Sequence, residues 1–192
     1  MKAAVFIDVQ NDFVKGGALP FACPEQDNTH EIIAFAEKCR AEGWQLFATA
    51  DTHSKAEYSS TLEGKRLPIE HCIEGTPGHR IIDGLVKDRD RNVIIPQGHI
   101  LDKRTFGSLD LGWKIESVFE QLNEPLEEIV LCGYCTSICV AANAVLLRAH
   151  FPNTKISVMA DLCGDVSREA HEAALTVMKM QQIDIIAQAK ES

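Results

Sequence analysis

The chain has 192 residues, of which 45% are hydrophobic and 24% are charged, and its formal net charge is -9. This length and composition are typical of a soluble globular protein with one core, so we expect a single domain over residues 1–192. The excess of acidic residues disfavours nucleic acids and anionic membranes as partners, because both would repel the protein.

The amino-terminal segment does not have the pattern of a signal peptide. Residues 1–7 hold six apolar residues before Asp8, and no small-residue cleavage site follows. No window of the chain approaches the length of a transmembrane helix. The seven cysteines follow no regular spacing, which indicates reduced thiols rather than a disulfide framework. We therefore expect a cytoplasmic protein.

Segments with strand and helix periodicity alternate along the chain. Strands are expected at residues 3–9, 45–50, 92–96, 127–132, 155–160 and 184–187. Helices are expected at residues 28–43, 112–122, 138–150 and 167–180, with a short one near 79–86. Residues 52–91 are otherwise irregular and rich in charge, glycine and proline, so we interpret them as a long functional loop.

This alternation predicts an α/β fold with a doubly wound, mostly parallel six-stranded sheet and helices on both faces, a Rossmann-like three-layer arrangement. Such sheets bind ligands outside the carboxyl ends of their strands. Five reactive side chains map to that edge of the predicted sheet: Asp8, Asp51, Lys103, Cys139 and Asp161.

Cys139 is the candidate nucleophile. It falls in the first turn of the helix expected at 138–150, where unpaired backbone N–H groups and the helix dipole favour a thiolate. We therefore expect this thiol to be more acidic than a free cysteine. The alternative reading is a structural cysteine in the core, because cysteine is among the residues most often buried.

Asp8 and Lys103 would complete a nucleophilic site around Cys139. Attack on an amide carbonyl needs a deprotonated sulfur and later a proton for the leaving amine, and one carboxylate such as Asp8 can serve both steps. The Lys103 ammonium would stabilise the negative charge that develops. Taken singly, Asp8 could be a helix cap and Lys103 a solvated surface residue.

A second group of residues has the character of metal ligands. Asp51 and His53 stand two apart in a loop that leaves a predicted strand, so both can face one point, and Glu63 and His71 follow. Imidazole and carboxylate ligands suit a divalent ion.

Several motifs together resemble the isochorismatase-like cysteine hydrolases, and within them the nicotinamidases. The matching segments are Phe6-Ile7-Asp8-Val9-Gln10-Asn11-Asp12-Phe13, Asp51-Thr52-His53, His71-Cys72-Ile73-Glu74-Gly75-Thr76-Pro77-Gly78, Asp102-Lys103-Arg104 and the turn from Gly133 to Val140. The family often has Asp at the position of Ser137, and nicotinamidases commonly have an aromatic residue in the segment that here contains Leu67.

The resemblance implies roles for particular residues. It implies a catalytic triad of Asp8, Lys103 and Cys139 with a thioester intermediate. It also implies a cis peptide between Tyr134 and Cys135 and an oxyanion hole formed by the N–H groups of Cys135 and Cys139. The metal ligands would be Asp51, His53 and His71 with Glu63 as the fourth, and the substrate contacts would be Phe13, Leu67 and Tyr134.

The leading hypothesis is a metal-containing amidohydrolase that converts nicotinamide to nicotinate and ammonia, with zinc as the expected ion and manganese or iron also admissible. One alternative is a relative that acts on another small amide or carbamoyl compound; hydrolysis of isochorismate is disfavoured because it does not require the thiol. A different class is a thiol redox protein using Cys132, Cys135 and Cys139. We expect a small-molecule amide as partner and self-association into a homo-oligomer.

Overall fold

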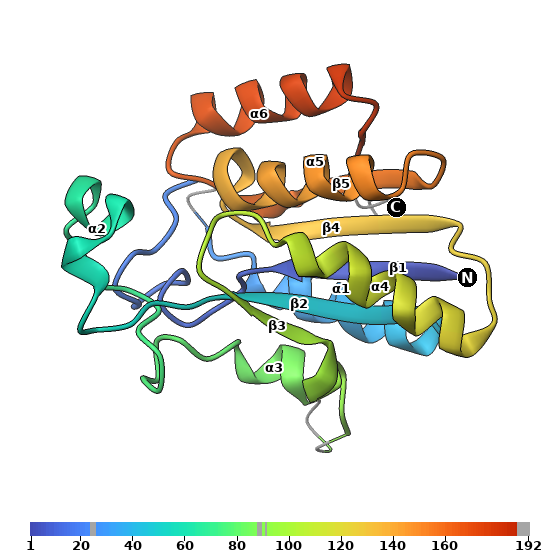
Figure 1. Cartoon of the computed structure of the whole chain (residues 1–192), viewed down its shortest axis with the longest axis horizontal. Helices are drawn as coiled ribbons and strands as arrows, with labels where there is room; N and C mark the ends of the chain where they lie inside the picture. The colour runs from blue at the N-terminus through green and yellow to red at the C-terminus, as the bar shows by residue number, and fades with distance from the viewer. Residues whose placement is uncertain (24–25, 88–89, 91, 188–192) are drawn as a thin grey trace.

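The computed structural model describes residues 1–23, 26–87, 90 and 92–187. In this part of the chain, six strands form one parallel sheet in the order β3-β2-β1-β4-β5-β6 (Figure 1). The strands are β1 Lys2–Ile7, β2 Gln45–Asp51, β3 Ile100–Lys103, β4 Glu128–Tyr134, β5 Lys155–Gly164 and β6 Asp184–Ile186. The predicted α/β fold is therefore confirmed.

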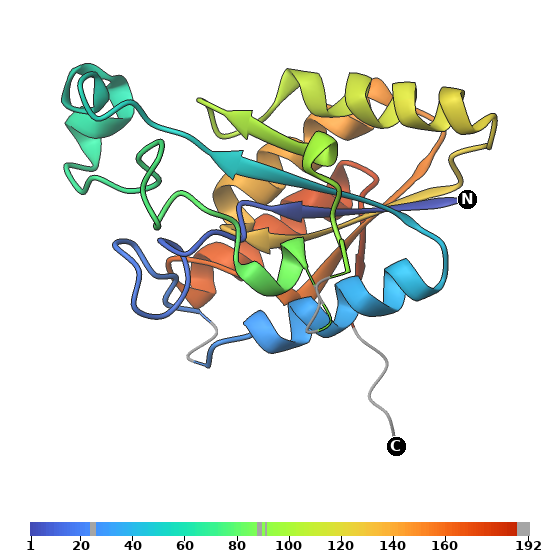
Figure 2. The same ribbon diagram turned by 90° about the horizontal axis from the view of Figure 1, so that it is seen from below.

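Helices cover both faces of the sheet, with α4 on one side and α1 on the other (Figure 2). The helices are α1 Thr29–Ala41, α2 Leu62–Arg66, α3 Asp83–Val86, α4 Leu109–Leu122, α5 Ala141–His150 and α6 Arg168–Met180. Helix α1 packs against α3, whereas α5 packs against both α4 and α6. Because the sheet is covered twice, the apolar side chains of β1 on both of its faces are fully buried.

The direction of the strand order reverses beside β1. The next strand in sequence, β2, pairs with one edge of β1, and β4 pairs with the other edge. In a doubly wound sheet such a reversal opens a crevice at the carboxyl ends of the two strands. Asp8, which follows β1, and the turn that carries Cys139, which follows β4, flank this crevice.

The third strand does not lie where the sequence pattern placed it. Residues 92–96 were expected to form it, but Ile94 and Ile95 donate their N–H groups to Val86 and Leu85 in the α3 region instead. Both side chains are buried, so this apolar run contributes to the core without joining the sheet. The strand is Ile100–Lys103, and its last residue, Lys103, pairs in register with Asp51.

The fifth strand is longer than expected. Its end was predicted at Asp161, but β5 continues to Gly164. The pairing of β5 with β4 shifts register between Leu131 and Gly133 and then resumes, with Cys163 opposite Gly133. Leu162 and Cys163 are both buried, so the strand can extend through them. Asp161 therefore lies within the strand as an exposed side chain and does not reach the ligand edge. Asp165, fully buried, follows the strand in its place.

The turn after β4 differs from a regular helix start. Thr136–Val140 forms one π-helical turn, and the regular helix begins only at Ala141. The peptide between Tyr134 and Cys135 is cis, as the resemblance implied. At Gly133, φ is +123°, and a Cβ there would overlap the carbonyl oxygen of Ile7 on β1, so this position requires glycine.

None of the helices in the described residues is long and apolar enough to cross a membrane.

Candidate active site

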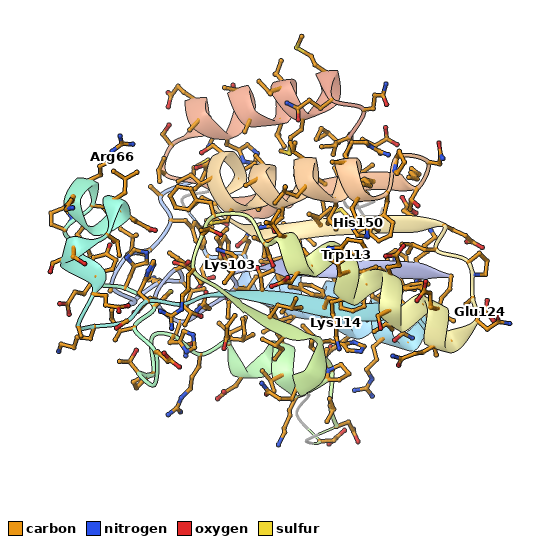
Figure 3. All side chains as sticks on the ribbon, in the orientation of Figure 1. Arg66, Lys103, Trp113, Lys114, Glu124 and His150 are labelled. Atoms are coloured by element: carbon orange, nitrogen blue, oxygen red, sulfur yellow. The ribbon has the colours of Figure 1, made fainter. Side chains whose placement is uncertain are left out.

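Lys103, Asp8 and Cys139 meet at the carboxyl ends of three strands. The Lys103 ammonium nitrogen lies 2.7 Å from Oδ2 of Asp8 and 3.6 Å from Sγ of Cys139. All three residues are buried, with exposed fractions of 4%, 0% and 6%. In Figure 3, Lys103 lies inside the molecule at the end of β3. The structure thus brings together the three groups that the sequence assigned to one site.

The backbone of Asp8 holds its carboxylate in place. Asp8 has a φ of +50°, an unusual conformation for a residue with a side chain. Its N–H group donates to the carbonyl oxygen of Thr49 at 3.1 Å, and the Thr49 hydroxyl donates to Oδ1 of Asp8 at 2.6 Å. Oδ2 is therefore the oxygen that faces Lys103.

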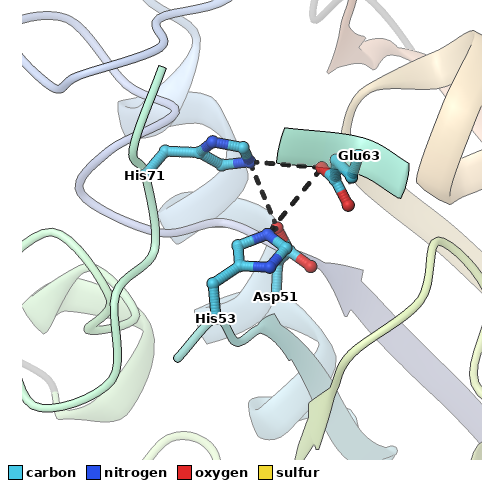
Figure 4. Close-up of side chains that lie close together, drawn as sticks. All are labelled: Asp51, His53, Glu63 and His71. Carbon is cyan, nitrogen blue, oxygen red and sulfur yellow. Dashed lines mark hydrogen bonds and ion pairs between the residues drawn. The ribbon is translucent and has the colours of Figure 1, made fainter. Parts of the chain in front are cut away.

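Asp51, His53, Glu63 and His71 converge on one point, and their ligand atoms all lie within 4.8 Å of one another (Figure 4). His53 Nε2 is 2.9 Å from Oδ2 of Asp51 and 3.8 Å from Oε1 of Glu63, and His71 Nε2 is 3.5 Å from each of these oxygens. His71 reaches His53 because the segment that follows it pairs with His53, through a bridge at Ile73.

This donor set fits a divalent cation. Metal–ligand bonds of about 2.1 Å in a tetrahedral site place neighbouring donor atoms roughly 3.4 Å apart, and the four measured separations scatter around that value. Nδ1 of His71 lies 2.8 Å from the carbonyl oxygen of Ile69, a partner that fixes the ring with Nε2 facing the cluster. The four side chains are therefore a candidate site for a divalent metal ion.

Cys139 and the four candidate metal ligands border the same pocket, which has a volume of about 520 Å³, whereas Asp8 and Lys103 lie behind its lining. Cys139 lies in its lining, as do Phe13, Leu67 and Cys135. The metal-binding candidates line it as well, namely Asp51, His53, Glu63 and His71. The remaining lining residues are Leu19, Pro20, Phe21, Thr61, Leu62, Arg66, Arg104, Thr105, Phe106, Ile138 and Val166.

Tyr134, expected to contact the substrate, does not line the pocket. It is fully buried, its hydroxyl donates to Oδ1 of Asn28 at 2.7 Å, and its ring stacks under Phe21 with centroids 4.5 Å apart. Tyr134 is the last residue of β4, and its side chain points into the core. Phe21, which covers the Tyr134 ring, lines the pocket instead.

The sequence matches the model of the isochorismatase domain over residues 2–190. The chain belongs to the isochorismatase family. It is 23% identical to the nicotinamidase of Escherichia coli strain K12, over 93% of this chain and 90% of that protein. The structure of nicotinamidase PncA from Bacillus subtilis matches with a TM-score of 0.76 at 24% identity, covering 97% of this chain and 99% of that one. The pyrazinamidase of Pyrococcus horikoshii, solved in complex with zinc, gives a TM-score of 0.74 at 23% identity, with 97% and 99% covered.

Electrostatics in this isochorismatase-family hydrolase keep the proton on the resting thiol. Burial raises the pKa of the Cys139 thiol well above its ordinary value, and the negative charge of Asp8 adds to this, whereas Lys103 opposes it. The expectation of an unusually acidic thiol at a helix start is therefore wrong. The dipole effect at an N-terminus is smaller than the cost of burying a thiolate beside a carboxylate.

Burial of the charged groups near the thiol shifts their pKa values, and the opposite charges beside them oppose these shifts. Burial alone would lower the pKa of the Lys103 ammonium, but Asp8, Cys139 and Asp51 raise it above its usual range. Burial raises the pKa of the Asp8 carboxyl, with Lys103 opposing. Burial likewise would lower the pKa of His71, yet its contacts with Asp51 and Glu63 raise that pKa to about 10. The two carboxylates thus create a field that attracts a cation.

Three supporting residues of this family member escaped the sequence reasoning. The buried Gln10 side chain exchanges hydrogen bonds with the backbone of Asp51, at 2.7 and 2.8 Å. The Tyr58 hydroxyl donates to the carbonyl oxygen of Leu67 at 2.7 Å, and the Tyr58 ring lies against His53 and His71, two of the candidate metal ligands. Asp165 directly follows β5, which ends at Gly164. The rule that reactive residues follow strands would have identified Asp165 if the sequence pattern had predicted this strand end.

Proposed function

We propose that this isochorismatase-family hydrolase is a metal-dependent cysteine amidohydrolase that converts nicotinamide and water to nicotinate and ammonia. The observation that carries the proposal is that Cys139, with Lys103 at 3.6 Å and Asp8 ion-paired to that lysine at 2.7 Å, lies in the same pocket as a four-residue cation site. A thiol and a cation site that face one pocket, with a buried proton acceptor close behind the thiol, suit attack on a bound amide.

Asp8 and Cys139 would perform the first half of the reaction. Asp8 takes the thiol proton as the sulfur bonds to the amide carbon, and the carbonyl oxygen becomes an oxyanion that accepts hydrogen bonds from the N–H groups of Cys135 and Cys139. The carbon–nitrogen bond then breaks, Asp8 gives its proton to the nitrogen, and ammonia leaves. Cys139 is left as a thioester. Lys103 stays charged throughout and stabilises the negative charge that moves between sulfur and carboxylate.

The second half uses the same groups with water. Asp8 removes a proton from the water, the oxygen bonds to the thioester carbon, and the carbon–sulfur bond breaks. The sulfur recovers the proton from Asp8, which restores the resting thiol and releases the carboxylic acid. Restoration of the proton to sulfur agrees with the raised pKa of Cys139.

The metal would be bound by Asp51, His53, His71 and Glu63, with zinc as the expected ion and manganese or iron also compatible with these ligands. When bound, it would supply a Lewis acid that holds the pyridine nitrogen of the substrate. Phe13, whose ring centroid is 5.5 Å from that of His71, would contact the face of the substrate ring, and Leu67 would contribute a further apolar contact.

A second candidate substrate is another small amide or carbamoyl compound. The pocket volume of about 520 Å³ is in the range of sites for drug-sized ligands, and nicotinamide has only a single ring. Phe21, Phe106 and Val166 add apolar surface to its lining. A larger substrate would use the same chemistry at Cys139 and make additional apolar contacts with these residues.

The redox alternative is disfavoured by the positions of the cysteines. The seven cysteines, all of which lie in the described residues, form no disulfide, and Cys132 is fully buried in β4 outside the pocket lining. Burial raises the pKa of the Cys132 thiol well above its usual value. A thiol that stays protonated and out of reach is a poor partner in disulfide exchange.

The proposal is tested by trapping the intermediate. We expect the metal-loaded protein to release ammonia from nicotinamide, and a slowly hydrolysed amide to leave its acyl group on Cys139, detected by intact-protein and peptide mass spectrometry after acid quench. Cys135, which lines the same pocket, is the internal control. An acyl group on Cys135, or amide hydrolysis that survives Cys139→Ala, would contradict the mechanism. Release of ammonia from other amides but not from nicotinamide would favour the second candidate.

A further inference from the structure

Asp165 is a fully buried carboxylate that the reaction above does not use. Its side chain accepts three hydrogen bonds, each 2.8 Å long. Oδ2 accepts from the N–H group of Ser137, and Oδ1 accepts from the Ser137 hydroxyl and from the N–H group of Val166. Two of these donors belong to the π-helical turn that carries Cys139.

The backbone of Asp165 holds a different segment. Its N–H group donates to the carbonyl oxygen of Cys23 at 2.6 Å, and its carbonyl oxygen accepts from the N–H groups of Ala22 and Cys23 at 2.9 Å each. This pairing fixes the chain that follows Phe21, a residue of the pocket wall. The backbone of Asp165 therefore supports the pocket wall, and its side chain supports the turn.

The residue before Asp165 provides a second attachment for the turn. The Thr136 hydroxyl, fully buried, donates to the carbonyl oxygen of Gly164 at 3.2 Å and lies 2.8 Å from Nδ1 of His171 on α6. Residues 164–165 thus contact residues 136 and 137, the first two residues of the turn.

Some backbone N–H groups of the turn donate to Cys135 at its start, and one donates to Asp165. Ile138 and Val140 both donate to the carbonyl oxygen of Cys135, at 3.1 and 3.0 Å, while Ser137 donates to Asp165. These three N–H groups are committed and cannot serve an oxyanion. The Asp165 carboxylate therefore fixes the peptide plane of Ser137, and with it the direction in which the next N–H groups and the Cys139 side chain point.

We propose that Asp165 is a positioning residue that holds the Cys139 turn in its reactive geometry. The expected change in kcat rests on the proposed function, whereas the expected change in the position of the turn rests on the hydrogen bonds alone. Loss of the carboxylate leaves the Ser137 N–H and hydroxyl groups without their buried acceptor, and the turn shifts to find others. Small displacements of a nucleophile by residues outside the chemistry cost about 10²-fold in rate.

The test compares Asp165→Ala and Asp165→Asn with Asp161→Ala, a matched control on the same strand whose side chain is exposed. Active sites are counted by labelling Cys139 and quantified by mass spectrometry, so that loss of folded protein does not count as loss of rate. We expect kcat per active site to fall by about 10–100-fold in Asp165→Ala while KM changes by less than about threefold, because the effect is on the reacting groups. Asp165→Asn keeps one acceptor oxygen and is expected to lie between this variant and the parent, and Asp161→Ala is expected to match the parent.

An unchanged kcat per active site in both Asp165 variants would overturn the proposal, as would a rise in KM that accounts for the whole loss. If Asp165→Ala does not fold, Asp165→Asn decides by the same criterion. The pH midpoint of Cys139 alkylation by iodoacetamide gives a second readout that needs no substrate. We expect it to shift by about one pH unit in Asp165→Asn as the sulfur moves relative to Asp8 and Lys103, and an unshifted midpoint overturns the proposal. A parent protein that hydrolyses no amide would refute the proposed function and leave this readout to decide on Asp165.

Discussion

At the scale of single residues, Asp51 links the two halves of the site. Its Oδ2 faces His53 at 2.9 Å and His71 at 3.5 Å, and its Oδ1 lies 3.4 Å from the Lys103 ammonium. One carboxylate thus contacts both the candidate metal site and Lys103, the proposed catalytic lysine. A ligand held at that site would have a defined distance to Cys139, because Asp51, a candidate metal ligand, also contacts the lysine beside the thiol.

The catalytic groups are expected to act as one unit. Asp8→Asn removes the base for the thiol and the acid for the leaving amine, so hydrolysis should slow by at least about 10²–10⁴-fold. Cys139→Ala should be at least as damaging, and the double variant should be scarcely slower than Cys139→Ala alone. Steady-state ammonia release measures all three. Multiplicative losses in the double variant would show that Asp8 acts independently of the thiol.

Metal content tests the second group of residues. We expect about one divalent ion per chain in the parent, and little in the His53→Ala, His71→Ala double variant, because two of four ligands are gone. Elemental analysis after dialysis gives the ratio and the identity of the ion. His30→Ala, at an exposed position on α1, is the matched control and should keep its metal. Equal metal in the double variant and the parent would refute the assignment.

At the scale of elements, the short helix α2 decides whether Glu63 reaches the cluster. The Thr61 side chain caps this helix by accepting a hydrogen bond from the N–H group of Gly64 at 3.0 Å. Gly64 lies against the Tyr58 backbone, where an added Cβ would overlap the Tyr58 carbonyl oxygen. The position of α2 therefore depends on a close contact that only glycine permits.

Gly64→Ala is expected to move α2 and weaken metal binding. The shift withdraws Glu63 while His53, His71 and Asp51 stay in place, so affinity for the ion should fall by about 10–100-fold, a loss typical of disturbed metal surroundings. Titration with zinc and a competing chelator measures it. Gly98→Ala is the control, because a Cβ there meets nothing within 4 Å. Unchanged affinity in Gly64→Ala would mean that Glu63 is not a ligand.

At the scale of the whole molecule, charged residues tie three strands together at the end of the sheet opposite the site. The buried Glu128 of β4 contacts Lys2 of β1 at 2.9 Å, and Lys155 and Ser157 of β5 at 2.8 and 3.1 Å. Burial alone would raise the pKa of Glu128, but the contacts with Lys155, Lys2 and Ser157 outweigh it and lower that pKa.

Glu128→Gln is expected to make the free energy of unfolding less dependent on pH in the acidic range. A carboxyl whose pKa is lower in the folded state stabilises that state above its unfolded pKa of about 4.3, and this contribution is lost as the pH falls through the folded value. The variant should therefore be about 1–2 kcal/mol less stable than the parent at pH 7, discounted for the exposed lysines, and this difference should shrink as the pH falls below the unfolded pKa. Urea unfolding at a series of pH values from 7 downward measures the difference. Glu124→Gln, on the exposed loop after α4, is the control (Figure 3). A difference between Glu128→Gln and the parent that does not shrink in acid would contradict the assignment.

Two expectations about the whole molecule stay predictions. Trp113 and Leu109 on α4 are exposed at 64% and 75%, an arrangement compatible with the predicted homo-oligomer. Sedimentation of the purified protein distinguishes a monomer from a larger assembly. The predicted cytoplasmic location likewise stays a prediction.

The sequence by itself determined the fold class and most of the residues at the site. Asp8 and Asp51 were found because a carboxylate that directly follows an apolar run marks the end of a buried strand, and the parallel order brings such ends to one edge. His53 and His71 followed from their chemistry and from the motifs around them. These signals are local, so they survive without knowledge of the rest of the chain.

The tertiary structure alone decided which apolar runs pair and which side chains face the pocket. Residues 92–96 contain the longer apolar run, Val93-Ile94-Ile95, whereas residues 100–103 have only Ile100 and Leu101 before two charged residues, yet pairing with β2 makes the second segment β3. The extension of β5 past Asp161, which makes Asp165 the residue at the strand end, depends on a register shift against β4. The burial of Tyr134 beneath Phe21 and the approach of Glu63 on α2 depend on contacts between segments far apart in sequence. Periodicity reports whether a residue is buried, but the identity of its neighbours is set by long-range packing, which no local pattern contains.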